Sequence, residues 1–125
     1  MINKEGSGWR LAWDPSKKQF PVLLGGEGWA FELSDREWKS FVKLVLDLIK
    51  EHKQINSQLM TGESISLELD RGLWWGCLDG DQKDWALQVV LQPQEALTRG
   101  IEVSWPIPIA KDFVDGMRIV WDSYK

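Results

Sequence analysis

Hydrophobic and polar residues alternate along several short stretches of the chain, which is the pattern of half-buried β-strands. Three such stretches come first, each with apolar residues at alternate positions: Gly8–Asp14, Gln19–Leu24 and Trp29–Leu33. The segments between them, Asp14–Lys18 and Gly25–Gly28, contain Asp, Pro, Ser and Gly residues that favour tight turns. We therefore predict an antiparallel meander of three strands at the start of the chain.

The pattern changes to that of a helix after Leu33. Ser34 and Glu37 have the spacing of a capping box, in which the two side chains satisfy backbone N–H groups at a helix start. The apolar residues that follow recur every three or four positions: Trp38, Phe41, Val42, Val45, Leu48 and Ile49. This segment is predicted to be a long helix that ends by Gly62 and packs against a sheet or a second helix.

The second half of the chain repeats this plan. Alternating stretches predict four more strands: Ser64–Asp70, Gly72–Leu78, Trp85–Leu91 and Ile101–Trp105. Gln92–Arg99 is predicted to be a polar connection, and an apolar stripe after Pro106 predicts a final helix, since proline is tolerated in a first helical turn. Gly72–Leu78 differs from the other strands because it carries bulky residues on both faces.

The order of elements is therefore β-β-β-α-β-β-β-β-α. It predicts an α+β fold of two β-meander-plus-helix units, with antiparallel sheets packed with two helices. Helices follow groups of strands rather than single strands, which disfavours a βαβ arrangement. Because 125 residues is a common size for one domain, we expect a single domain over residues 1–125, with an internal pseudo-repeat at about residues 1–60 and 61–125.

The charge distribution bears on the kind of partner. The chain has 15 basic and 19 acidic residues and a net charge of −4, with a pI near 5.0. Residues 61–125 contain six basic and eleven acidic residues and account for the whole acidic excess. Phosphate binding draws on clustered Lys and Arg, so this acidity disfavours nucleic acid as a partner.

The sequence also indicates where the protein acts. It contains no apolar run of the roughly 20 residues that a membrane-spanning helix needs, and its first residues lack a hydrophobic signal region. The single cysteine, Cys77, cannot form an internal disulfide and fits a reducing compartment. We expect a cytoplasmic protein that does not enter a membrane.

Residues that could carry chemistry are few and scattered. His52 and Cys77 each stand alone, whereas a cysteine nucleophile needs a base beside it and a metal site needs several ligands. Asp79, Asp81 and Asp84 lack the spacing of a calcium loop and are predicted to form a solvated hairpin tip. We therefore expect no catalytic residue, no metal and no cofactor, and a protein that is not an enzyme.

Tryptophan is the abundant residue of interest, with nine in the chain against one tyrosine and four phenylalanines. Tryptophan serves as core filler, interface anchor or stacking platform for bases. If one sheet face is open, the candidate binding surface consists of these five residues: Arg10, Trp13, Lys17, Lys18 and Trp74. The alternative is that the tryptophans of the first meander face a helix as core, because Trp9, Leu11 and Trp13 share one strand face.

Five motifs together resemble a family of cyanobacterial proteins, the domain of unknown function 1818. They are G-W-R-L-A-W-D at Gly8–Asp14, F-P-V-L-L at Phe20–Leu24, G-G-E-G-W-A-F-E-L at Gly25–Leu33, G-L-W-W at Gly72–Trp75 and S-W-P at Ser104–Pro106. The resemblance implies a fold like that of the Whirly and single-stranded-DNA-binding transcriptional coactivator group, in which β4-α units pair. It implies no catalytic residues. The coactivator group binds single strands on a basic sheet surface, and the acidity of this chain departs from that pattern.

Two functional hypotheses follow. The first is a non-enzymatic interaction module that acts through a protein partner or through self-association, as expected for an aromatic-rich chain with bulky groups on both faces of Gly72–Leu78. The second is the binding of single-stranded nucleic acid through the first sheet, with bases stacked near its basic residues.

Overall fold

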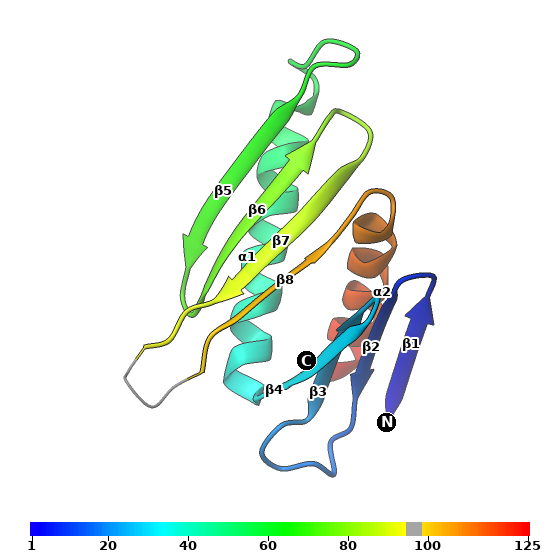
Figure 1. Cartoon of the computed structure of the whole chain (residues 1–125), viewed down its shortest axis with the longest axis vertical. Helices are drawn as coiled ribbons and strands as arrows, with labels where there is room; N and C mark the ends of the chain where they lie inside the picture. The colour runs from blue at the N-terminus through cyan, green and yellow to red at the C-terminus, as the bar shows by residue number, and fades with distance from the viewer. Residues whose placement is uncertain (95–98) are drawn as a thin grey trace.

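The computed structural model describes residues 1–94 and 99–125, within which the chain forms two four-stranded sheets and two helices (Figure 1). The first sheet consists of β1 (Ile2–Gly6), β2 (Trp9–Trp13), β3 (Val22–Gly26) and β4 (Trp29–Leu33). Helix α1 (Asp35–Asn56) follows it. The second sheet consists of β5 (Ile65–Arg71), β6 (Trp74–Gly80), β7 (Trp85–Leu91) and β8 (Ile101–Trp105), and helix α2 (Ile109–Tyr124) ends the chain.

Every pair of neighbouring strands is antiparallel and adjacent in sequence, so both sheets are meanders. The predicted α+β fold of two meander-plus-helix units is therefore confirmed. The first sheet contains an additional edge strand, β1, that the sequence pattern did not predict. Within this strand only Ile2 is partly buried, so the alternation of apolar residues that predicts a strand is absent. The predicted connection Gln92–Arg99 falls partly on residues 95–98, outside the described part of the chain.

The capping box at the start of α1 is present as predicted. The Ser34 hydroxyl accepts a hydrogen bond from the backbone N–H of Glu37, and the Glu37 carboxylate accepts one from the backbone N–H of Ser34. The helix ends at Asn56, several residues before Gly62. Ser57–Glu63 instead forms turns, and Gly62 adopts a φ of +81° that favours glycine.

Each helix packs on the sheet that comes from the other half of the chain. Helix α1 lies against β5 and β6, whereas α2 lies against β1 and β2 and also contacts β7 and β8. Two glycines make these contacts close. A Cβ at Gly76 in β6 would lie 2.7 Å from Leu44 of α1, and a Cβ at Gly116 in α2 would lie 2.5 Å from the ring of Trp9. The exchange of helices joins the two meander-plus-helix units through a shared core.

Aromatic residues from both sheets and both helices meet in this core. Trp105 of β8 stacks on Phe113 of α2 with ring centroids 3.9 Å apart, and Phe41 of α1 packs edge-on against both rings. The indole N–H of Trp105 donates a hydrogen bond to the carbonyl oxygen of Gly25 in β3, 3.1 Å away. The core therefore spans the boundary between the two sheets rather than forming separately beneath each one.

Candidate interaction surface

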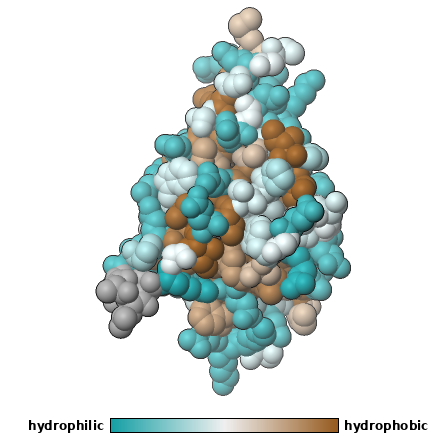
Figure 2. All heavy atoms as spheres, viewed as in Figure 1, coloured by the Kyte–Doolittle hydropathy of each residue, from teal (hydrophilic) through white to brown (hydrophobic). Residues whose placement is uncertain are grey.

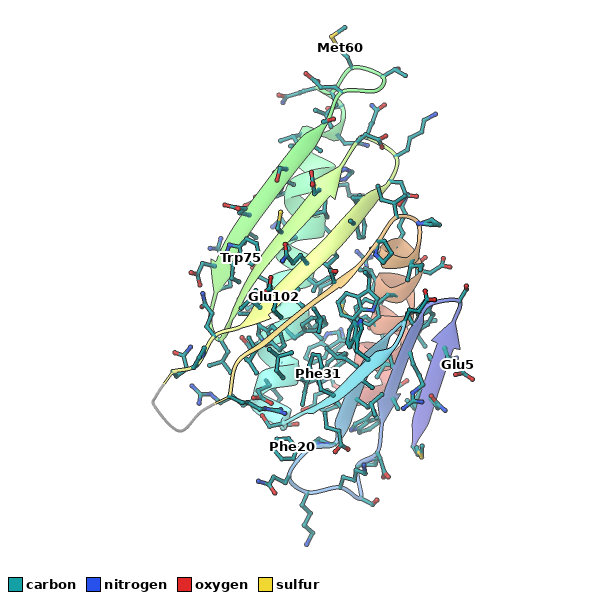
Figure 3. The ribbon with its side chains drawn as sticks, viewed as in Figure 1. Glu5, Phe20, Phe31, Met60, Trp75 and Glu102 are labelled. Atoms are coloured by element: carbon teal, nitrogen blue, oxygen red, sulfur yellow. The ribbon has the colours of Figure 1, made fainter. Side chains whose placement is uncertain are left out.

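Neither of the two described helices covers the outward side of the second sheet, because α1 lies on its other side (Figure 1). Strand register places eleven side chains on this outward side: Ser66, Glu68, Asp70, Trp75, Cys77, Asp79, Ala86, Gln88, Val90, Glu102 and Ser104. We call this surface the acidic face. Trp75 and Glu102 project from it toward the viewer in Figure 3.

Four carboxylates and no cation occupy the outward positions of these four strands. The carboxylates belong to Glu68, Asp70, Asp79 and Glu102, all of which are exposed. None of the four forms an ion pair with any residue that the structure describes. A surface with four unpaired charges of one sign attracts groups of the opposite sign and repels groups of the same sign.

Apolar side chains lie between these carboxylates. One row across the sheet contains Asp70, Trp75, Val90 and Glu102 in that order, so an aromatic and an aliphatic side chain sit between two carboxylates. Trp75, Cys77 and Val90 are each only half-buried. In Figure 2, which looks onto this side of the molecule, hydrophobic atoms over the second sheet are interrupted and bordered by hydrophilic ones.

A shallow hollow of about 350 Å³ lies beside this row, over β6, β7 and β8. Its outward lining includes Cys77, Asp79, Ala86, Gln88 and Ser104. Two polar contacts order the side chains around it. The Gln88 amide donates to the Glu102 carboxylate over 2.7 Å, and the Ser66 hydroxyl lies 3.5 Å from the Cys77 sulfur. The face thus combines a tryptophan, a depression and a carboxylate rim.

The five residues of the predicted binding surface do not come together. Arg10 and Lys18 are exposed, and Lys17 is exposed but pairs with Glu32. Trp13 lies on the opposite face of β2 from Arg10 and packs edge-on against Tyr124 of α2, at a centroid distance of 5.4 Å. Trp13 is thus part of the packing between sheet and helix, as the alternative in which the tryptophans face a helix predicts.

Trp74 is also misplaced in that surface, because its side chain is fully buried. It lies on the helix side of β6, where its indole N–H donates to the carbonyl oxygen of Glu37 over 3.0 Å. Its neighbour Trp75 points the other way and is the residue that reaches the surface. Sequence alternation predicts that the two indoles lie on opposite faces, but it does not say which face a helix covers.

The outward side of the first sheet has a different character. Its outward positions are Asn3, Glu5, Arg10, Ala12, Leu23, Gly25, Ala30 and Glu32. None of these is aromatic, and the charges are mixed. The tryptophans of this sheet point inward, where Trp9 lies across Gly6 and Trp29 lies across Gly26, positions at which a Cβ would be 2.4 and 2.3 Å from the rings. This face therefore offers no platform on which bases could stack.

The candidates for chemistry have ordinary structural surroundings. His52 is 7% exposed, and its Nε2 lies 2.9 Å from the carbonyl oxygen of Asp81. The Asp81 carboxylate accepts hydrogen bonds from the backbone N–H groups of Asp84 and Lys83, which lower its pKa. This is the geometry of a hairpin tip. Within residues 1–94 and 99–125, no three or more His, Cys, Asp or Glu side chains form a group that could hold a metal ion.

Arg99 makes the interaction that sequence analysis missed. Its guanidinium pairs with the Glu37 carboxylate, donates to the carbonyl oxygen of Glu32, and lies 4.7 Å above the ring of Phe20. Burial acts to raise the pKa of Glu37, but hydrogen bonds from Arg99 and from the Ser34 backbone outweigh it, so the pKa lies below its ordinary value. No sequence signal links Arg99 to Glu37, since 62 positions separate them.

The described part of the chain contains no helix of the length and apolar character needed to cross a membrane. The fold and its surfaces define an α+β protein of two units, each a four-stranded meander with a helix, that leaves an acidic sheet face uncovered. The chain belongs to the family described as domain of unknown function DUF1818, which matches residues 4–120.

A solved structure with the same fold is similar over nearly the whole chain. It is a 1.80 Å crystal structure of a protein with unknown function, described as from the DUF155 family, from Prochlorococcus sp. NATL2A. That protein is 44% identical to this chain, and the match covers 97% of this chain and 99% of that one with a TM-score of 0.90. No curated protein matches the chain.

Proposed function

We propose that the protein is a non-enzymatic interaction module of the cyanobacterial cytoplasm and that it binds a protein partner through the acidic face. One observation carries this proposal. Trp75 lies partly exposed in a central strand, on the side of the second sheet that no described helix or strand covers. Tryptophan is among the residues that contribute most to protein interfaces, and uncovered apolar surface with a polar rim is typical of them.

The proposal is supported by a contrast within β6. The inward residues Trp74, Gly76 and Leu78 are buried against α1 and complete the core without help from the outward side. Trp75 and Cys77 contribute little to that core, so folding alone does not account for an indole at position 75. A partly exposed indole that lies outside the core is expected to contact another molecule.

Site-specific crosslinking tests the proposal. A photoreactive phenylalanine analogue replaces Trp75 in the chain expressed in its native cells, and the matched control carries the same analogue at Ile119, an exposed apolar residue of α2. We expect a discrete crosslinked protein adduct from position 75 that is absent from position 119. Equal adduct patterns at the two positions, or none at position 75, would refute a role of the acidic face in protein binding.

The second candidate function is single-stranded nucleic-acid binding within a Whirly-like fold. The pairing of two β4-α units favours it, together with the exposed Arg10 and Lys18. Its test is a titration of labelled single-stranded oligonucleotides at low salt. Micromolar, salt-sensitive binding that weakens when Lys17 and Lys18 are changed to Glu would place this function first. We expect a flat titration, because the outward side of the first sheet has no aromatic side chain.

A further inference from the structure

The charges of the acidic face restrict what can bind there. A second copy stacked on the same face would bring together two sets of the four carboxylates Glu68, Asp70, Asp79 and Glu102, and such like-charge contacts oppose association. The phosphates of a nucleic acid would meet the same repulsion. A cationic segment is instead attracted by all four carboxylates. The charge pattern therefore favours such a segment as the binding partner.

Trp75 adds a second feature that suits a cation. The indole is the aromatic ring that attracts ammonium and guanidinium groups most strongly, within about 6 Å of the ring. In this row the ring lies between Asp70 and Val90, so a basic side chain lying over it would also be close to a carboxylate. The same ring, together with Val90, offers an apolar contact to a side chain between two basic ones.

The spacing of the row suggests how such a segment lies. Asp70 and Glu102 belong to β5 and β8, three strand spacings apart, which corresponds to about 14 Å at the usual separation of strands. An extended segment advances by roughly 3.3 Å per residue, so its side chains at positions i and i+4 span about the same distance and point to the same side. The side chain at i+2 then meets Trp75 and Val90.

We propose that the acidic face binds an extended, Lys- or Arg-rich segment of another protein, with the pattern basic-x-apolar-x-basic, laid across the strands from Asp70 to Glu102. This inference rests on the proposed function and specifies the partner's chemistry. The two basic side chains pair with the carboxylates at the ends of the row, and the apolar one packs on Trp75 and Val90.

The test uses a synthetic peptide, Gly-Arg-Ser-Leu-Ser-Arg-Gly, titrated into the isotopically labelled chain and followed by NMR. We expect shifts at the outward positions of β5–β8, including the indole N–H of Trp75, and none on the outward side of the first sheet. A peptide with Glu in place of both Arg residues is the charge control and should not bind. Shifts spread evenly over the molecule would overturn the proposal.

Variants of the chain identify which residues contribute to the affinity for the peptide. Changing Asp70 and Glu102 to Lys is expected to weaken peptide binding by about tenfold or more, and Trp75→Ala by about fivefold. The matched control changes two other exposed acidic residues, Glu27 and Asp115, to Lys, which alters the net charge equally. If this control weakens binding as much as the pair on the acidic face, only net charge matters and the proposal fails.

The outcomes separate the two proposals. A crosslink at position 75 without peptide binding would reject the basic segment but keep the acidic face as a protein interface. Dimerisation in sedimentation that is lost on Trp75→Ala would show a second copy as the occupant and reject the basic segment. Peptide binding confined to the acidic face, lost with the Lys pair and kept in the control, supports the inference.

Discussion

The outward faces of the two sheets differ although the sheets share one topology. Both are four-stranded antiparallel meanders whose inner sides pack on helices. The first sheet directs all its aromatic side chains inward, and its outer face carries small residues and mixed charges. The second carries Trp75 between carboxylates on its outer face. The two sheets thus share a scaffold, and their outward residues make the second sheet the candidate binding surface.

The difference in outward aromatic residues follows from how tryptophans are spaced within a strand. In β2, the two tryptophans, Trp9 and Trp13, are four positions apart, so they share one face and both point inward. In β6, Trp74 and Trp75 are adjacent, so one indole must point outward. The first pattern serves packing alone. In the second pattern, the Trp74 ring packs in the core and the Trp75 ring lies on the outward side of the sheet.

The largest expected effect separates these two adjacent indoles. Trp74→Ala should reduce the free energy of unfolding by about 3–5 kcal/mol, because it leaves a cavity beneath the sheet and removes the hydrogen bond to Glu37. Trp75→Ala should cost far less, since that ring lies outside the core and is partly exposed. Urea unfolding measures both. Similar losses for the two variants would contradict the division of β6 into a core face and a face outside the core.

A smaller effect, which depends on pH, is expected where the two sheets meet. Arg99, beside the second sheet, holds Glu37, which caps α1 after the first sheet. Because the pKa of Glu37 is lowered in the folded state, its ionised form stabilises the fold above the ordinary value of 4.5. This contribution is lost as the pH falls through the folded-state pKa.

Glu37→Gln should therefore lower the free energy of unfolding at pH 7 by about 1–3 kcal/mol, as expected for hydrogen bonds to a charged group. The difference from the unmodified chain should shrink as the pH falls below 4.5. Denaturant midpoints measured between pH 3 and pH 7 test this. A difference that stays constant over that range would show that the charge of Glu37 contributes nothing.

The smallest effect is expected on the outward side of the first sheet. The ion pair between Lys17 and Glu32 is exposed to solvent on both partners, and such pairs add little stability. Lys17→Met should leave the thermal midpoint unchanged. It should also leave binding of the basic peptide unchanged, since Lys17 lies in the connection between β2 and β3 and not on the acidic face. A clear loss of either property would mean that the two outward faces are coupled.

Much of the fold could be predicted from local signals. Alternation of apolar residues located seven of the strands, and the spacing of Ser34 and Glu37 located the start of α1. Strand β1 was not predicted, because an edge strand with one partly buried residue lacks the alternation of apolar residues that indicates a strand. The end of α1 was predicted too late because Ile55 and Leu59 continue a helical spacing that the turns after Asn56 interrupt.

The sequence by itself determined the meander-plus-helix order of both halves apart from β1, the helix cap, the opposite orientation of Trp74 and Trp75, and the acidic excess of the second half. These depend on residues near each other in the chain. Only the tertiary structure decided that each helix covers the other half's sheet, that Arg99 reaches Glu37 across 62 positions, and that Trp75 rather than Trp74 faces outward. Those outcomes depend on which apolar faces are complementary in shape, with glycines at the close contacts, and a one-dimensional pattern does not contain that information.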